Sequence, residues 1–163
     1  MKIIGEVKET DLAWAAGIID GEGCISIDKN RPSAGNRLRN VNYKLNLRLN
    51  MVHKPTIEKL HNMFNVGFIQ CITKRKYART RREQWGWSVT GDRATWVLEM
   101  ILPYLYTKKT QALLAIGFQE TMRIKYNRSR GIPSELIDIR ESFYQAIKID
   151  KRAEWPQLEQ INQ

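Results

Sequence analysis

The chain has 163 residues, enough for one ordinary domain with its own hydrophobic core. Hydrophobic residues make up 42% and charged residues 27%, which excludes a wholly disordered or fibrous chain, and no apolar run approaches the roughly 20 residues needed to span a bilayer. The net charge of +10 indicates a polyanionic partner.

The first residues do not have the pattern of a targeting segment. Glu6, Glu9 and Asp11 interrupt the chain before an apolar stretch forms, which argues against a secretory signal and against an acid-poor transit peptide. The two cysteines, Cys24 and Cys71, are too few for a disulfide framework or for a zinc site of their own. We therefore expect an intracellular protein that is not secreted, with reduced thiols and no membrane partner.

The first predicted element is a short apolar helix over residues 11–20, with Thr10 or Asp11 as its N-cap and a break at residues 21–23. Small residues recur at every fourth position of this helix. They form a smooth stripe against which either a second helix or the chain's own sheet can pack. The stripe consists of Ala13, Gly17 and Gly21, with Ala16 beside it.

Two carboxylates lie at the predicted end of this helix. Asp20 and Glu22 stand where the helix dipole is already negative, so each needs a compensating cation. A hard divalent ion, bound by a carboxylate and a nearby backbone carbonyl, would supply it. A Lys or Arg partner, or plain exposure to solvent, are the alternatives.

Four strands and four more helices are predicted after this helix. Alternation predicts strands over residues 24–30, 41–51, 67–76 and 84–90, and apolar periodicity predicts helices over residues 55–64, 93–102, 108–125 and from Ser134 onward. The last helix is expected to bury Leu136, Ile139, Phe143 and Ile147. Because hairpins join the strands, we predict an α+β fold with a mostly antiparallel sheet. One domain covers residues 1–163, with a core over about 11–125 and a C-terminal helical extension over about 131–163.

The strand over residues 41–51 has the clearest periodicity in the chain. Its apolar face alternates with a face of Asn, Lys and Arg that carries no acid. Between Cys24 and Thr90 there are 14 Lys and Arg residues but only three Asp and Glu residues, and residues 74–82 form an especially basic turn. We therefore expect one open sheet face that is broad, cationic and rich in amides, as a duplex groove requires.

Residues 15–23, with the sequence AAGIIDGEG, resemble the nine-residue signature of the LAGLIDADG homing endonucleases. Five of the nine positions carry the consensus residue: Ala16, Gly17, Ile19, Asp20 and Gly23. The predicted order of helices and strands is also similar to that family's core, α-β-β-α-β-β-α. The resemblance implies this fold, with a saddle-like DNA-binding sheet and extra C-terminal helices.

The resemblance also implies a metal site. In this family the last acid of the motif binds the catalytic metal and the residue before it contributes its backbone carbonyl, which here implies Glu22 and Gly21 as ligands. The implied cofactor is Mg²⁺ or another divalent cation such as Mn²⁺, with Ca²⁺ in non-cleaving complexes. Asp20 matches the earlier motif acid, whose role is structural.

Two further site residues are implied by position in the family's fold. A lysine at the start of the helix after the third core helix is expected at the periphery of the active site; Lys108 matches it, with Lys109 as the register-shifted alternative. A polar residue near the end of the second strand is expected to order the active-site water. Asn50 is the candidate, with His53 as the alternative.

Family members with one motif are homodimers, so the resemblance implies that two copies of this chain pack through their first helices. The expected dimer interface is Ala13, Ala16, Gly17, Asp20 and Gly21, and it would bring two Glu22 carboxylates together. Alternation then gives the residues expected to contact DNA: Ser26, Asp28, Asn30, Asn42, Lys44, Asn46, Arg48, Gln70, Ile72, Lys74, Lys76, Arg79, Gln84 and Ser88.

The implied function is site-specific cleavage of both strands of double-stranded DNA. As an intron-encoded homing endonuclease of an organelle (chloroplast or mitochondrion), a bacterium or a phage, the protein would hydrolyse phosphodiesters in a long pseudo-palindromic target. Two alternatives use the same fold. The first is an intron maturase that binds RNA, and the second is a DNA-binding regulator that does not cleave.

Overall fold

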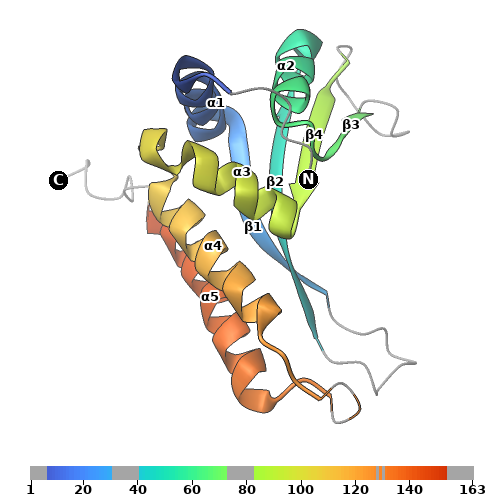
Figure 1. Ribbon diagram of the computed structural model, residues 1–163, viewed down its shortest axis with the longest axis vertical. Coiled ribbons are helices and arrows are strands. Elements are labelled where there is room, and N and C mark those ends of the chain that lie inside the picture. The colour runs from blue at the N-terminus through green and yellow to red at the C-terminus, as the bar shows by residue number, and fades with distance from the viewer. Residues whose placement is uncertain (1–6, 31–40, 73–82, 128, 130, 154–163) are drawn as a thin grey trace, which may run out of the picture.

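The computed structural model describes residues 7–30, 41–72, 83–127, 129 and 131–153. This part of the chain has the predicted α+β order of elements, with two helices following the α-β-β-α-β-β-α core (Figure 1). The elements are α1 (Glu9–Glu22), β1 (Gly23–Asn30), β2 (Asn42–Met51), α2 (Lys54–Phe64), β3 (Phe68–Cys71), β4 (Trp85–Thr90), α3 (Asp92–Ile101), the 3-10 turn η1 (Leu102–Tyr104), α4 (Lys109–Arg123) and α5 (Ser134–Ala153). Within these ranges, no helix has the length and apolar character needed to cross a membrane.

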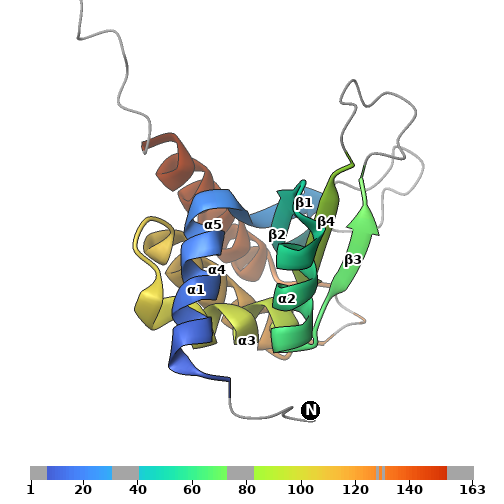
Figure 2. The same cartoon turned by 90° about the horizontal axis from the view of Figure 1, so that it is seen from above.

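The four strands form one sheet in the order β1-β2-β4-β3, and all three pairs are antiparallel, as predicted. The helices lie together on one face of the sheet and leave the other face open (Figures 1 and 2). β3 is shorter than the predicted strand over residues 67–76. It ends at Cys71, and residues 73–82 lie outside the described part of the chain.

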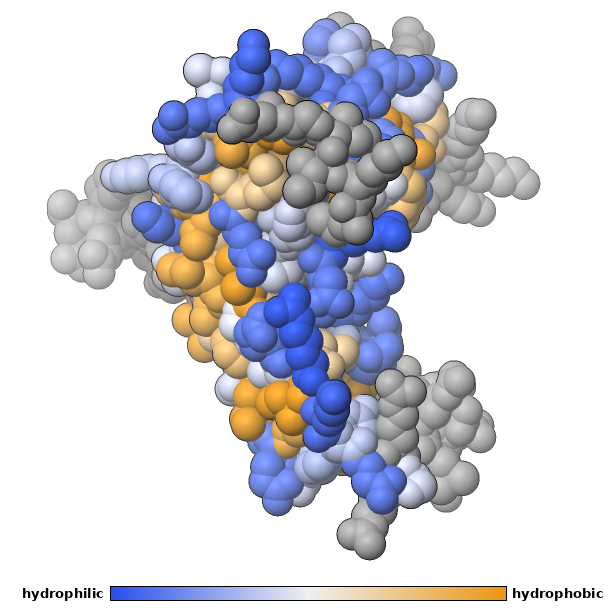
Figure 3. Space-filling view, in the orientation of Figure 1, coloured by the Kyte–Doolittle hydropathy of each residue, from blue (hydrophilic) through white to orange (hydrophobic). Residues whose placement is uncertain are grey.

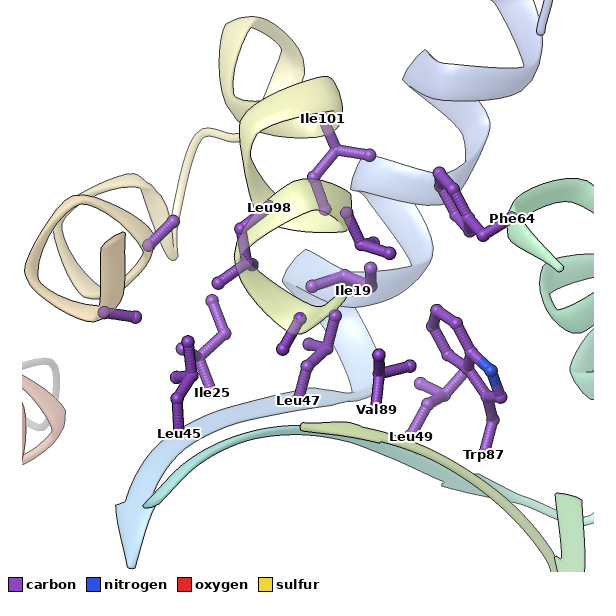
Figure 4. Packing of buried hydrophobic residues seen from close by; sticks show 14 of the residues in the cluster. Ile19, Ile25, Leu45, Leu47, Leu49, Phe64, Trp87, Val89, Leu98 and Ile101 are labelled. Atoms are coloured by element: carbon purple, nitrogen blue, oxygen red, sulfur yellow. The ribbon is translucent and has the colours of Figure 1, made fainter. Parts of the chain in front are cut away.

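The hydrophobic core lies between the sheet and the helices (Figure 4). Leu45, Leu47 and Leu49 alternate along β2 and are fully buried, and they face Ile19 of α1 and Ile101 of α3, which are also fully buried. Burying one such side chain stabilises the fold by about 1.5–3 kcal/mol relative to exposure. This alternation therefore decides which face of the sheet the helices cover. The sheet arches so that its open face is concave (Figure 4).

Both ends of the first helix differ from the prediction. α1 begins at Glu9, and its N-cap is Lys8, which makes no side-chain capping hydrogen bond; Thr10 lies within the helix. The predicted helix end at residue 20 is two residues too early, because α1 continues through Gly21 to Glu22. The chain turns at buried Gly23, where a Cβ atom would lie 2.6 Å from the carbonyl oxygen of Ile19. The chain therefore leaves the helix at the last residue of the predicted break, where only glycine fits against Ile19.

The C-terminal helix also differs from the prediction in one residue of its buried face. Leu136 and Ile147 are buried, but Ile139 is 45% exposed, and the next residue, Arg140, is buried instead. Arg140 donates Nη2–H to the backbone oxygen of Thr121 at 2.8 Å, near the end of α4. This contact with unpaired helix-end carbonyls outweighs the apolar periodicity of α5. Exposed apolar side chains consequently follow α4 and α5 on the helical side of the molecule (Figure 3).

A partly buried polar cluster fixes α5 to the first two strands. Glu141 accepts a hydrogen bond from Lys29 Nζ of β1 at 2.7 Å and another from the Tyr43 hydroxyl of β2. These two hydrogen bonds hold the pKa of the Glu141 carboxyl at about 2. Burial, together with Glu141, raises the pKa of Tyr43 above its ordinary value. The extension is thus a part of the domain that sets the position of the β1–β2 hairpin.

Candidate nucleic-acid interface and metal site

The open face of the sheet forms a wide groove lined mainly by polar side chains. Successive side chains of a strand point to opposite faces, so the residues between the core positions of β2 and β4 line this groove. The lining residues are Lys44, Asn46, Arg48, Asn50, Phe68, Gln70, Ile72, Trp87, Ser88 and Thr90.

Strand register brings these residues into rows across the groove. Arg48 of β2 lies opposite Ser88 of β4, which lies opposite Phe68 of β3. The next row is Asn50, Gly86 and Gln70. A Cβ atom at residue 86 would lie 2.7 Å from Asn50 Oδ1, so glycine makes the room in which the Asn50 amide sits. The groove therefore has a defined pattern of amide, cationic and apolar groups.

The predicted DNA contacts that fall on described residues lie on this open face or along its edge, but they differ in exposure. Lys44 and Gln70 are exposed, whereas Asn46 is only 4% exposed and Ser88 only 8%. Asn46 uses its amide within the chain, donating Nδ2–H to the backbone oxygen of Lys44 at 3.1 Å. Alternation alone predicted all these residues as DNA contacts without distinguishing them. The concave surface leaves the longer side chains accessible and covers the shorter ones, Asn46 and Ser88. The predicted contacts Lys74, Lys76 and Arg79 lie outside the described residues.

One carboxylate reaches the cationic part of the groove. Asp28 of β1 pairs with Arg48 of β2 and also accepts a hydrogen bond from Ser26 Oγ at 3.3 Å. Both partners of the ion pair are about 40% exposed in their side chains. An ion pair this exposed contributes only about 0–1 kcal/mol, so a phosphate or a guanine edge can compete with Asp28 for Arg48.

Asp20 is held by the turn that precedes α4. Its carboxylate accepts backbone N–H groups from Tyr106 at 2.7 Å and from Lys108 at 2.9 Å, and Lys108 Nζ donates to the Asp20 backbone oxygen. Burial alone would raise the pKa of Asp20, but the backbone donors outweigh it and the pKa lies below its ordinary value. The cation that the end of α1 needs near Asp20 is therefore Lys108, and Asp20 has a structural contact within its own chain.

Glu22 occupies a different environment from Asp20. It is the last residue of α1 and is exposed, as is Gly21 before it. The last carbonyls of a helix have no partner four residues ahead, so the Gly21 carbonyl and the Glu22 carboxylate are hard oxygen ligands at one exposed helix end. This donor set fits Mg²⁺, which binds through one or two carboxylates together with waters and substrate phosphates.

The described residues do not complete a metal site by themselves. They contain no group of three or more His, Cys, Asp and Glu side chains that could hold a metal ion. Water, a nucleic-acid phosphate or a second copy of the chain can supply further ligands for a cation at Glu22. The alternative water-ordering residue His53 has a contact of its own, since His53 Nδ1 lies 2.8 Å from Thr56 Oγ1.

The small-residue stripe of α1 points away from the domain. Ala13, Gly17 and Gly21 are exposed, and a Cβ atom at Gly17 or Gly21 would meet no atom within 4 Å. Packing of this stripe against the chain's own sheet, one of the two alternatives, is therefore wrong. Ala16, expected in the interface beside the stripe, is instead fully buried in the core of the protomer.

Of the lining residues that were not predicted, Trp87, Thr90 and Phe68, only Phe68 is exposed. It is 53% exposed at the edge strand β3, two residues before Gln70 and on the same face. The same alternation that gave Gln70 and Ile72 gives Phe68, so the signal was present.

Comparisons with known proteins give one consistent result. A sequence model of the LAGLIDADG endonuclease family matches residues 15–117, and no curated protein sequence matches the chain. The fold is similar to that of the homing endonuclease I-CvuI in complex with the I-CreI target, with a TM-score of 0.70, 17% identity, and coverage of 87% of this chain and 82% of that one. It is also similar to the archaeal intron-encoded homing endonuclease I-Vdi141I complexed with DNA, with a TM-score of 0.68, 11% identity, and coverage of 87% and 84%.

A longer chain contains the same fold. The LAGLIDADG homing endonuclease I-SmaMI bound to cleaved DNA matches with a TM-score of 0.63 and 14% identity, over 89% of this chain but only 46% of that one. The fold thus occurs both in chains of about this length and as part of a chain about twice as long.

Proposed function

Because this chain belongs to the LAGLIDADG endonuclease family, we propose that it is a site-specific endonuclease that cleaves both strands of double-stranded DNA as a homodimer. The observation that carries this proposal is the position of Glu22. An exposed carboxylate ends α1 directly before the first strand of a concave, cationic sheet, so a duplex lying on the sheet brings its phosphates to that carboxylate.

The groove suits the major groove of DNA in charge and in length. Arg48 and Lys44 can pair with guanine edges or phosphates, and Gln70 with adenine edges. β2 has ten residues, which at about 3.3 Å each span roughly the length of ten base pairs. Two copies would cover on the order of twenty base pairs with approximate two-fold symmetry.

A second copy of the chain accounts for the small-residue stripe. Ala13, Gly17 and Gly21 are exposed on a helix whose opposite side is fixed in the core, so two such helices can approach closely. A two-fold interface uses the same surface on both copies. It would place one Glu22 from each copy near the symmetry axis, one for each DNA strand.

The residues around Glu22 have separable roles in this proposal. A divalent cation held by the Glu22 carboxylate and the Gly21 carbonyl would lower the pKa of a bound water and neutralise charge at the cleaved phosphate. Lys108, fixed on the Asp20 carbonyl, adds positive charge at the negative end of α1. The exposed Asn50 amide can orient a water at the neighbouring end of β2.

Incubation of the protein with a randomised duplex library, with and without Mg²⁺, tests this function. We expect double-strand cleavage only with Mg²⁺ or Mn²⁺, and binding without cleavage in Ca²⁺. Glu22→Gln should abolish cleavage and leave DNA affinity within a few-fold, whereas Glu99→Gln, which changes an exposed carboxylate on α3, should leave both unchanged. Cleavage by the Glu22 variant at the parental rate would contradict the assignment. Binding of structured RNA in preference to every duplex would favour the maturase alternative.

A further inference from the structure

An apolar side chain stands on a surface that is otherwise built for polar contacts. Phe68 is 53% exposed and lines the groove of the open sheet face together with Arg48, Gln70 and Ser88. Phenylalanine left in water on a concave surface loses the free energy that burial would supply. Its position in the groove makes an apolar surface available to an apolar group on whatever ligand fills the groove.

The backbone before Phe68 fixes this side chain in place. Asn65 ends α2 in the left-handed conformation, and the Val66 carbonyl accepts a hydrogen bond from Trp87 Nε1 at 2.9 Å. Gly67 follows with φ +82°, where a Cβ atom would lie 2.4 Å from the Ser88 carbonyl oxygen. Phe68 then pairs with Ser88 as the first residue of β3. It projects from a strand that is hydrogen-bonded in register, and not from a loose loop.

A second apolar side chain lies further along the same edge. Ile72 lines the groove two residues beyond Gln70, and its Cδ1 atom covers Gly86 closely enough to lie 2.9 Å from a Cβ placed there. Along the outer edge of the groove an apolar side chain, an amide and a second apolar side chain therefore follow one another: Phe68, Gln70 and Ile72. Ile72 is only partly exposed, which leaves Phe68 as the main apolar contact.

The major groove of DNA offers one apolar group, the C5-methyl of thymine. Resting on the proposed DNA-binding function, we propose that Phe68 is a specificity residue that selects thymine by covering its C5-methyl group. Gln70, on the same face, can pair with an adenine edge beside it. Strand residues rise about 3.3 Å each and base pairs about 3.4 Å each, so Phe68 and Gln70 address positions about two base pairs apart.

Deoxyuridine is the probe that isolates this contact, because it differs from thymidine only in lacking the C5-methyl group. Half-sites selected from a randomised duplex library are resynthesised with each thymine replaced in turn by deoxyuridine, and their affinities are measured in Ca²⁺. We expect one position at which the replacement weakens binding of the parent protein about fourfold, the effect of losing about one buried methyl group. Deoxycytidine replaced by 5-methyldeoxycytidine at that position should recover part of the loss caused by a C·G pair.

Three variants test whether Phe68 causes the difference in affinity between the thymine and deoxyuridine sites. Phe68→Ala should bind the thymine and deoxyuridine sites equally, and Phe68→Leu should retain part of the difference. Leu113→Ala serves as the matched control, because Leu113 is exposed to the same extent (52%) but lies on α4, on the helical side. This control should keep the fourfold difference.

The outcomes separate this inference from the function on which it rests. If the parent selects and binds a duplex with strong salt dependence but tolerates deoxyuridine at every position, the role of Phe68 is wrong and the DNA-binding proposal stands. If a deoxyuridine effect persists unchanged in Phe68→Ala, another residue reads the methyl group and the inference is again wrong. If no duplex is selected at all, both proposals fail together.

Discussion

Replacement of Gly17 should move the stability of the protomer and the stability of the dimer in opposite directions. Gly17 lies in the middle of α1 and is exposed, and a Cβ atom there meets nothing within 4 Å. Glycine in a helix interior is about 0.8–1 kcal/mol less favourable than alanine, and leucine is a good helix former. Gly17→Leu should therefore raise the unfolding free energy of the isolated protomer by about 0.5–1 kcal/mol.

The dimer responds to the same change with a loss. In the proposed interface the two α1 helices approach at Gly17, and extra side-chain volume in a packed interface costs about 1–3 kcal/mol at each site. Two-fold symmetry introduces the substitution twice, for a total of about 2–6 kcal/mol. The dissociation constant of the dimer should rise at least about 30-fold. α1 itself stays in place, because its Ile19 is buried in the core and Lys59 Nζ of α2 lies 4.1 Å from the ring centre of its Trp14.

Two measurements on the same samples separate these effects. Denaturant titration below the dimer's dissociation constant reports protomer stability, and sedimentation at higher concentrations reports assembly. Asn62→Leu is the control, since it adds an exposed leucine to α2, away from the stripe. A Gly17→Leu protein that remains dimeric, or a parent that is monomeric on DNA and still makes double-strand breaks, would refute this account of the interface.

Three further substitutions test other parts of the site and fold. Gly86→Ala should slow cleavage, because the added Cβ atom would lie 2.7 Å from Asn50 Oδ1 and would displace the Asn50 amide. Circular dichroism should show an unchanged fold, and a parental cleavage rate would contradict the role of Asn50. Asp28→Asn should release Arg48, raise affinity for all duplexes and steepen the salt dependence of binding measured by fluorescence anisotropy, and weaker binding would contradict it. Glu141→Gln should weaken the dependence of the unfolding free energy on pH, measured by urea titrations between pH 2 and 6. Because the folded-state pKa is lowered from 4.5 to about 2, the parent's extra stability of at most about 3 kcal/mol is complete above about pH 4.5 and is lost as the pH falls towards 2. Parallel pH profiles for parent and variant would contradict it.

The order of elements, the antiparallel sheet and the identity of its two faces were predictable from the sequence. Period-two alternation decides which side of a strand is apolar before any partner is known, so Leu45 and Leu47 had to face the helices and Lys44 had to face away. The motif in residues 15–23 likewise identified the family that its sequence model then matched. These features depend on spacing along the chain, which the sequence contains in full.

Only the tertiary structure decided which of two similar residues is held by the rest of the chain, because that depends on contacts between distant segments. Asp20 and Glu22 are both acids at the end of α1, yet it is the Asp20 carboxylate that accepts hydrogen bonds from the backbone N–H groups of Tyr106 and Lys108. No local pattern contains these contacts, since burial and hydrogen-bond supply at one residue are set by segments far away in sequence.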